Sequence, residues 1–183
     1  LLTIFAFSTS HAKKVNVGII LGFTGPIESL TPDMAAGAEL AFSEASNSGN
    51  LLNGSKINVI RADSTCIDSA AATSAAEGLV SQGVTAIMGA DCSGVTGAIL
   101  SNVAVPNGVP MISPSATSPG LTTAEDNGLF FRTAPSDARG GEVLADITAD
   151  RGITSVAITY VNTDYGVGLA DVYEAAAKAR GIE

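Results

Sequence analysis

The chain has 183 residues, of which 46% are hydrophobic and 15% are charged, and its formal net charge is −9. This balance is that of a folded globular protein and excludes intrinsic disorder. The acid excess, with no Lys/Arg cluster beyond the pair Lys13–Lys14, argues against nucleic acid as a partner.

The first residues are predicted to lie outside the fold. The apolar run Leu1–Phe7 is followed by small and polar residues that end in Ser10-His11-Ala12. This pattern favours a signal peptide remnant over residues 1–12, and so predicts export to the periplasm; a short N-terminal strand is the alternative. A membrane span needs about 20 apolar residues, so no direct membrane insertion is expected. With no initiating Met, and with residues 180–183 resembling a helix end before a new strand, we expect a fragment at both ends.

The first strand–helix unit follows this leader. Val15–Leu21 is a continuous, β-branched apolar run, as expected of a strand that is buried on both faces. A glycine-bearing loop over 22–30 comes next. Thr31 is predicted to be the N-cap of a helix, because the Pro and Asp that follow it suit a first turn. Asn47–Gly49 ends this helix.

The same alternation repeats along the chain. Further strands are predicted over 57–63, 85–89, 110–113, 129–132 and 155–161. Further helices are predicted from about 68 to 83, 93 to 105, 136 to 151 and 165 to 180, with Asp68, Ser93 and Ser136 at the first three starts. A loop rich in Ser, Thr, Pro and Gly covers 114–128.

Strands that alternate with helices predict an α/β fold, a doubly wound parallel sheet with helices on both faces. A domain boundary is predicted near 133–141, because four strand–helix units are complete before it and a new series begins after it. The expected organisation is therefore one complete lobe over 13–135 and the start of a second, truncated lobe over 136–183.

The sequence contains two cysteines, Cys66 and Cys92. In an exported protein, an even pair of cysteines is most simply a disulfide bond. Two buried free thiols are the alternative.

Ligands of open parallel sheets bind at the carboxyl ends of the strands, where the strand order reverses. If the order is 2-1-3-4, the loops to inspect are 22–30, 90–94 and 114–119. Ser93 at a helix start forms an anion site suited to an α-carboxylate, and the hydroxyls of Ser115 and Thr117 lie next door. All three residues could instead have a purely structural role: Ser93 as a helix cap, and Ser115 and Thr117 as turn residues.

No catalytic set is found. Cys92-Ser93-Gly94 resembles part of a nucleophile elbow, but Asp91 stands where that motif requires Gly. The one histidine is His11, inside the predicted leader, so the rest of the chain has no imidazole base. Phosphate and dinucleotide loops are absent, and Cys and His are too few for a zinc site. We therefore expect no enzymatic activity, no cofactor and no metal.

Four segments resemble one known family: Val15–Pro26, Ile112–Thr122, Phe131–Asp137 and Asp164–Gly168. They are similar to the leucine/isoleucine/valine-binding proteins, the periplasmic receptors of branched-chain amino acid ABC transporters. Both cysteines also fall where that family has its disulfide. The resemblance implies a type I periplasmic-binding-protein fold, whose two lobes close on an amino acid or a related solute and deliver it to a transporter permease.

The resemblance also implies six ligand-binding residues: Ser93, Ser115, Ala116, Thr117, Asp137 and Tyr165. Ser93 and Thr117 would hold the ligand carboxylate, and Ser115 and Thr117 would reach its amine. Asp137 matches an acidic position that faces the amine, and Tyr165 would close over the ligand from the second lobe. Asp137 as the cap of the following helix is the alternative.

One departure from the family leaves the ligand side chain open. Leu30 stands roughly where the leucine-binding members have a Tyr, and the family also includes receptors for amides, urea and aromatic acids. The second functional class to consider is the extracellular sensing domain of a receptor, which shares this fold. An enzyme comes third, since its catalytic group would have to lie outside this sequence.

Overall fold

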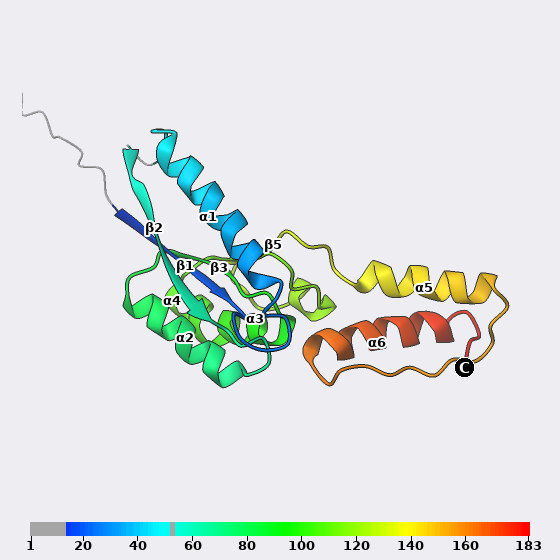
Figure 1. Ribbon diagram of the computed structural model, residues 1–183. Coiled ribbons are helices and arrows are strands. Elements are labelled where there is room, and N and C mark those ends of the chain that lie inside the picture. Colours follow the sequence, from blue (N-terminus) through cyan, green and yellow to red (C-terminus); the bar gives the residue numbers. More distant parts are fainter. Residues whose placement is uncertain (1–13, 52–53) are drawn as a thin grey trace, which may run out of the picture.

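The computed structural model describes residues 14–51 and 54–183 (Figure 1). The predicted signal peptide over 1–12 lies outside the described residues. Within them, five parallel strands form one sheet in the order β2-β1-β3-β4-β5. The strands are β1 (Lys14–Leu21), β2 (Lys56–Asp63), β3 (Ala86–Gly89), β4 (Met111–Ser113) and β5 (Phe130–Arg132). The doubly wound fold and the strand order are confirmed.

The helices follow the predicted alternation. They are α1 (Thr31–Asn47), α2 (Ser69–Ser81), α3 (Ser93–Ile99), α4 (Val105–Asn107), α5 (Ala138–Asp150) and α6 (Asp164–Lys178). A π-helical turn, η2 (Leu100–Ala104), joins α3 to α4, and a 3₁₀ turn, η3 (Pro119–Thr122), lies in the loop before β5. Asp68 caps α2 as predicted, since its carboxylate accepts from two first-turn N–H groups. Among the described residues, no helix combines the length and apolar character needed to cross a bilayer.

The core lies on both faces of the sheet, because side chains alternate along each strand. Ile20 packs with Ile87 of β3 against α2, α3 and η2. Its neighbours Ile19 and Leu21 point to the other face and pack against α1. Figure 1 shows α1 and α2 on opposite sides of the strands. Helices on both faces leave the carboxyl ends of the strands open for a site.

Thr31 does not cap α1, so that prediction was wrong. The N-cap residue is Leu30, and it makes no side-chain cap bond. Thr31 is fully buried, and its hydroxyl lies 3.1 Å from the carbonyl oxygen of Gly22 and 3.4 Å from that of Glu28. A hydroxyl has one hydrogen to donate, and here it closes the loop between β1 and α1.

The Cys66–Cys92 disulfide is confirmed, with an Sγ–Sγ distance of 2.02 Å. It joins the loop after β2 to the residue before α3. Thr65 and Cys66 both have positive φ angles, 58° and 69°, a region that L-residues other than Asn and Asp seldom adopt. Asp63 supports this turn by accepting from the N–H of Thr65 at 2.8 Å.

Replacing both cysteines with serine is expected to lower the free energy of unfolding by about 3.5 kcal/mol, because the bond closes a loop between residues 26 apart in sequence. Urea unfolding of the oxidised wild type and the Cys66→Ser/Cys92→Ser variant measures this difference. The reduced wild type is the matched control and should unfold like the variant. Two alkylatable thiols in the oxidised, folded protein would contradict the assignment.

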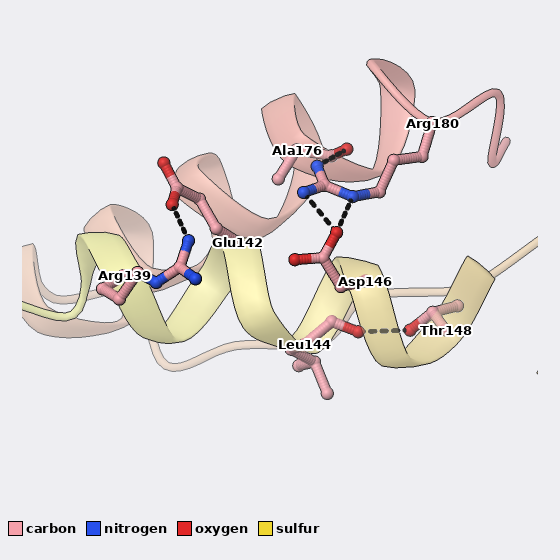
Figure 2. Close-up of polar contacts among 7 residues, drawn as sticks. All are labelled: Arg139, Glu142, Leu144, Asp146, Thr148, Ala176 and Arg180. Carbon is pink, nitrogen blue, oxygen red and sulfur yellow. Dashed lines mark hydrogen bonds and ion pairs between the residues drawn. The ribbon is translucent and has the colours of Figure 1, made fainter. Parts of the chain in front are cut away.

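After β5 the chain leaves the sheet, and α5 and α6 pack against each other beside it (Figure 1). Ala145 of α5 is buried against Ala176 and Ala177 of α6. Figure 2 shows the polar contacts of this pair, in which the Asp146 carboxylate lies 2.6 Å from the Arg180 guanidinium. These two helices form a small packed unit of their own.

The predicted strand over 155–161 was wrong as a strand. The segment is extended but joins no sheet, and its side chains are mostly exposed. A strand needs a neighbour with which to form a hydrogen-bonded ladder. Among the described residues only Glu183 offers one: its N–H donates to the Thr154 carbonyl at 2.9 Å, and its carbonyl accepts from the Val156 N–H at 2.7 Å.

Candidate functional site

A cleft of about 930 Å³ opens at the carboxyl ends of β1 and β3, the two strands between which the strand order reverses. Its walls come from the loop after β1, the residues around the start of α3, and the loop after β4. Residues of the loop after β2, Asp137 and the segment 161–165 also line it. This volume suits a small molecule that fills the cleft partly or wholly.

The structure brings most of the predicted site residues together. Ser93, Ser115, Thr117, Asp137 and Tyr165 all line the cleft, and so do both cysteines. Ala116 is not among the lining residues. It is buried, its N–H donates to the Ser113 hydroxyl at 3.0 Å, and its carbonyl accepts from Arg132 at 3.3 Å. Its observed contacts hold the loop after β4 in shape.

Ser93 lines the cleft and is 3% exposed. It is the first residue of α3, whose N-cap is Cys92, and no side chain caps this helix. The Ser93 oxygen instead accepts from the N–H of Ser118 at 3.1 Å. Its hydroxyl hydrogen has no acceptor within residues 14–51 and 54–183, and it lies beside first-turn amides that have no partner within the helix. The structure therefore does not support the alternative of Ser93 as a cap.

Ser115 and Thr117 have different hydrogen-bonding capacities. The Ser115 hydroxyl donates to the Asp91 carbonyl at 2.9 Å, which leaves its lone pairs available as acceptors. The Thr117 hydroxyl has no partner among the described residues, so it can donate or accept. Its carbonyl accepts from the Asp137 N–H at 3.0 Å, which ties this loop to the start of α5.

Asp137 occupies the N-cap position of α5 without acting as a side-chain cap. The N–H of Ala138 donates to the Ser136 hydroxyl at 3.3 Å instead, so the cap position lies one residue after the predicted Ser136. In the described part of the chain, Asp137 Oδ2 is buried and has no hydrogen-bond partner. A buried carboxylate oxygen without a donor is costly, so this atom is free to accept a hydrogen bond from a bound ligand or water.

Part of the cleft lining, here called the apolar wall, consists of four apolar side chains. Ile27 and Leu30 come from the loop after β1, Met34 from α1, and Ile67 from the loop that the disulfide holds. Leu30 is 56% exposed and Ile67 is 66% exposed, which is unusual for large aliphatic side chains in a concave site. Ile67 was missed from the sequence, because a single apolar residue in a loop has no periodic pattern.

Asp63 at the end of β2 fixes the loops beside the cleft. Partial burial raises its pKa, but hydrogen bonds from the Thr24 hydroxyl and from backbone N–H groups outweigh burial and hold the pKa below its ordinary value. The carboxylate therefore stays ionised at neutral pH. No group of three or more His, Cys, Asp or Glu that could hold a metal ion occurs in residues 14–51 and 54–183.

One glycine lets α6 approach the loop after β4 closely. A Cβ on Gly168 of α6 would lie 3.1 Å from the Ser118 hydroxyl and 3.1 Å from Cδ of Pro119. Tyr165, in the first turn of the same helix, lines the cleft and is 45% exposed.

Comparison with known sequences gives one consistent family. Residues 14–183 match the model of a family described as periplasmic binding protein. The Leu/Ile/Val-binding protein homolog 3 of Brucella melitensis is 32% identical over 179 residues, which cover 96% of this chain and 47% of the relative. The Leu/Ile/Val-binding protein BraC3 of Rhizobium johnstonii is 32% identical and covers 100% of this chain and 49% of the relative. The chain thus spans about half the length of the curated relatives it matches.

Solved structures agree with this comparison. The branched-chain amino acid transporter substrate-binding protein LivJ of Streptococcus pneumoniae, in complex with isoleucine, has a TM-score of 0.77 and 30% identity. It covers 90% of this chain and 47% of its own. An ABC transporter substrate-binding protein of Desulfitobacterium hafniense, in complex with Leu, has a TM-score of 0.73 and 30% identity, and covers 92% of this chain and 48% of its own.

Proposed function

The chain belongs to the periplasmic binding protein family, and we propose that it is the front part of an extracytoplasmic receptor that delivers an amino acid to an ABC transporter. The family consists of solute-binding proteins, so the proposed role is binding and release without catalysis. The names of the relatives favour a branched-chain amino acid or a related small solute as the ligand.

The observation that carries this proposal is the buried, unpartnered Oδ2 of Asp137 in the same cleft as the Ser93 hydroxyl. An ammonium group supplies the donor that Asp137 lacks. A carboxylate supplies the acceptor that Ser93 lacks, next to the positive end of α3. Together they would read the two charges of a zwitterion through charge-assisted hydrogen bonds.

The apolar wall supports an aliphatic side chain on that zwitterion. Ile27, Leu30 and Ile67 line the cleft, and the last two expose most of their surface. Covering such surface stabilises a complex by about 25 cal/mol per Å² removed from water. Leucine, isoleucine and valine offer matching apolar groups of suitable size.

The organisation of the receptor is part of the proposal. Residues 13–135 would form the first lobe and 136–183 the start of the second, with the cleft between them. Residues 1–12 would be the remnant of a signal peptide that directs the protein to the periplasm, where it meets the permease. The position of Tyr165 on the second part, facing the residues of the first, supports closure of the two lobes on the ligand.

Calorimetry on the full-length protein tests the proposed ligand class. L-leucine, L-isoleucine and L-valine are expected to bind. The des-amino analogue 4-methylpentanoate and the des-carboxy analogue 3-methylbutylamine should each bind about 10- to 100-fold more weakly than leucine, since each lacks one charge-assisted hydrogen bond. Equal affinity for leucine and either analogue would show that the site does not read a zwitterion.

A further inference from the structure

Asp91 has a buried carboxylate and is not among the residues proposed to contact the ligand. It lies at the carboxyl end of β3, lines the cleft and is 3% exposed. None of the ion pairs among the described residues includes it. A carboxylate is seldom buried without a cation unless several hydrogen bonds replace its hydration. The hydrogen-bond donors around the Asp91 carboxylate therefore indicate the role of this side chain.

The Asp91 carboxylate joins the ends of three adjacent strands. Its Oδ2 accepts from the N–H of Gly22, which follows β1, at 2.8 Å. Its Oδ1 accepts from the hydroxyl of Ser64, which follows β2, at 3.2 Å, and from the N–H of Cys92 at 3.0 Å. Because β2, β1 and β3 are neighbours in the sheet, this one side chain ties together the ends of three of the strands beside the cleft.

The contact with Gly22 is so close that a larger residue there would have to displace its neighbours by a few tenths of an ångström. A Cβ at position 22 would lie 3.2 Å from Asp91 Oδ2 and 3.1 Å from the Cβ of Cys66. Gly22 begins the loop that carries Ile27 and Leu30 into the cleft. The close approach of this loop to the Asp91 carboxylate thus helps to determine the positions of Ile27 and Leu30 in the cleft.

The main chain of Asp91 also contacts the hydroxyl-bearing part of the cleft lining, here called the polar wall (Ser93, Ser115 and Thr117). Its carbonyl accepts from the Ser115 hydroxyl, and so orients the lone pairs of Ser115. Ser93, the proposed donor to the ligand carboxylate, follows two residues later. Asp91 is therefore connected to the apolar wall through Gly22 and to the polar wall through Ser115 and Ser93.

We propose that Asp91 is a positioning residue, whose carboxylate sets the distance between the apolar loop after β1 and the hydroxyls that hold the ligand. This inference rests on the proposed function. Asp91 acts through Gly22, since three of the roughly four acceptor sites of its carboxylate are already occupied by protein donors. It is distinct from Asp137, whose buried oxygen has no protein donor.

Two substitutions in the full-length protein test the inference with L-leucine as the probe. Asp91→Asn preserves the shape but leaves one acceptor oxygen for three donors. With that oxygen toward Ser64 and Cys92, where it keeps two hydrogen bonds, the amide group faces the Gly22 N–H, donor against donor. Gly22→Ala leaves the carboxylate intact and moves the loop. Each is expected to raise Kd for leucine about 10-fold. The double variant should also be about 10-fold weaker, because both changes break the same contact.

Ser64→Ala is the matched control, since it removes one hydrogen bond to the same carboxylate without touching the Gly22 contact; its Kd should stay within about twofold of the wild type. The Gly22 amide proton provides a readout independent of ligand. Its resonance should move upfield and its exchange with solvent should accelerate in Asp91→Asn but not in Ser64→Ala.

Wild-type affinity in Asp91→Asn, or additive losses of about 100-fold in the double variant, would overturn the inference while leaving the proposed function intact. Failure of the wild type to bind leucine, isoleucine or valine would overturn the proposed function and the inference with it. Should Asp91→Asn not fold, Gly22→Ala decides alone, and an unchanged Kd there would overturn the inference.

Discussion

Asp137→Asn in the full-length protein is expected to weaken leucine binding at least about 30-fold, with little change in melting temperature. Removing one partner of a buried, hydrogen-bonded charge pair costs about 2–5 kcal/mol, much of it from the charge left unpaired. The stability of the free protein should hold, because the Asp137 side chain makes no cap bond and its Oδ2 has no partner to lose. Binding and stability are thus separable at this residue.

Calorimetry with leucine and 4-methylpentanoate measures this effect. In the variant, the ratio of the two dissociation constants should move toward one, because the carboxylate proposed to accept from the ammonium group of leucine is gone. Ser136→Ala is the matched control: its hydroxyl accepts from the Ala138 N–H at the start of α5, so its loss should cost about 1 kcal/mol of stability and leave affinity unchanged. If Asp137→Asn instead melts earlier and keeps its preference for leucine, its role is structural and the amine is read elsewhere.

The fold was predictable from local patterns because each pattern has a physical cause that acts within the segment. The run Val15–Leu21 is apolar except for Asn16 because helices cover both faces of its strand, and the structure places β1 there. Asp68 was recognised as a cap because an N-cap acts on N–H groups only two and three residues away. Right-handed parallel connections then left few possible strand orders.

The errors arose where distant partners decide the outcome. Thr31 has the residue type and position of a cap, but its hydroxyl bonds to the Gly22 carbonyl nine residues earlier. The β-branched segment over 155–161 has the composition of a strand, but composition does not supply the neighbouring strand that a ladder requires. Neither partner can be read from a short window of sequence.

In the candidate site, too, features that depend on local sequence were predictable and features that depend on distant partners were not. The rule for parallel sheets pointed to loops that line a cleft in the structure, where Ser93, Ser115 and Thr117 lie together. Their role in binding stays a prediction. Sequence alone could not separate Ser93 as a ligand donor from Ser93 as a cap, because the choice depends on the N–H of Ser118, 25 residues away. Asp91 was noticed only as a departure from a catalytic motif, since its role depends on strands that meet in space.

Residues 1–183 alone are expected to bind leucine at least about 100-fold more weakly than the full-length protein. The relatives that bind such ligands are about twice as long, and in this chain the apolar wall is still largely open to water, with Ile67 66% exposed and Leu30 56% exposed. Polar contacts made in water contribute about 1 kcal/mol or less each, and full burial of a Leu or Ile side chain contributes about 1.5–3 kcal/mol. A cleft that lacks the covering half of its receptor loses both contributions together.

Calorimetry on the two proteins measures the difference, and circular dichroism with thiol titration shows whether the shorter chain is folded and keeps its disulfide. That control matters because an unfolded fragment would also fail to bind. The Asp137→Asn variant of the short chain adds a second comparison: its effect should shrink to a few-fold, since an ion pair that water can reach is worth about 0–1 kcal/mol. Equal affinities of the short and full-length proteins would mean that the cleft described here is sufficient, and closure of two lobes would then not be the source of binding energy.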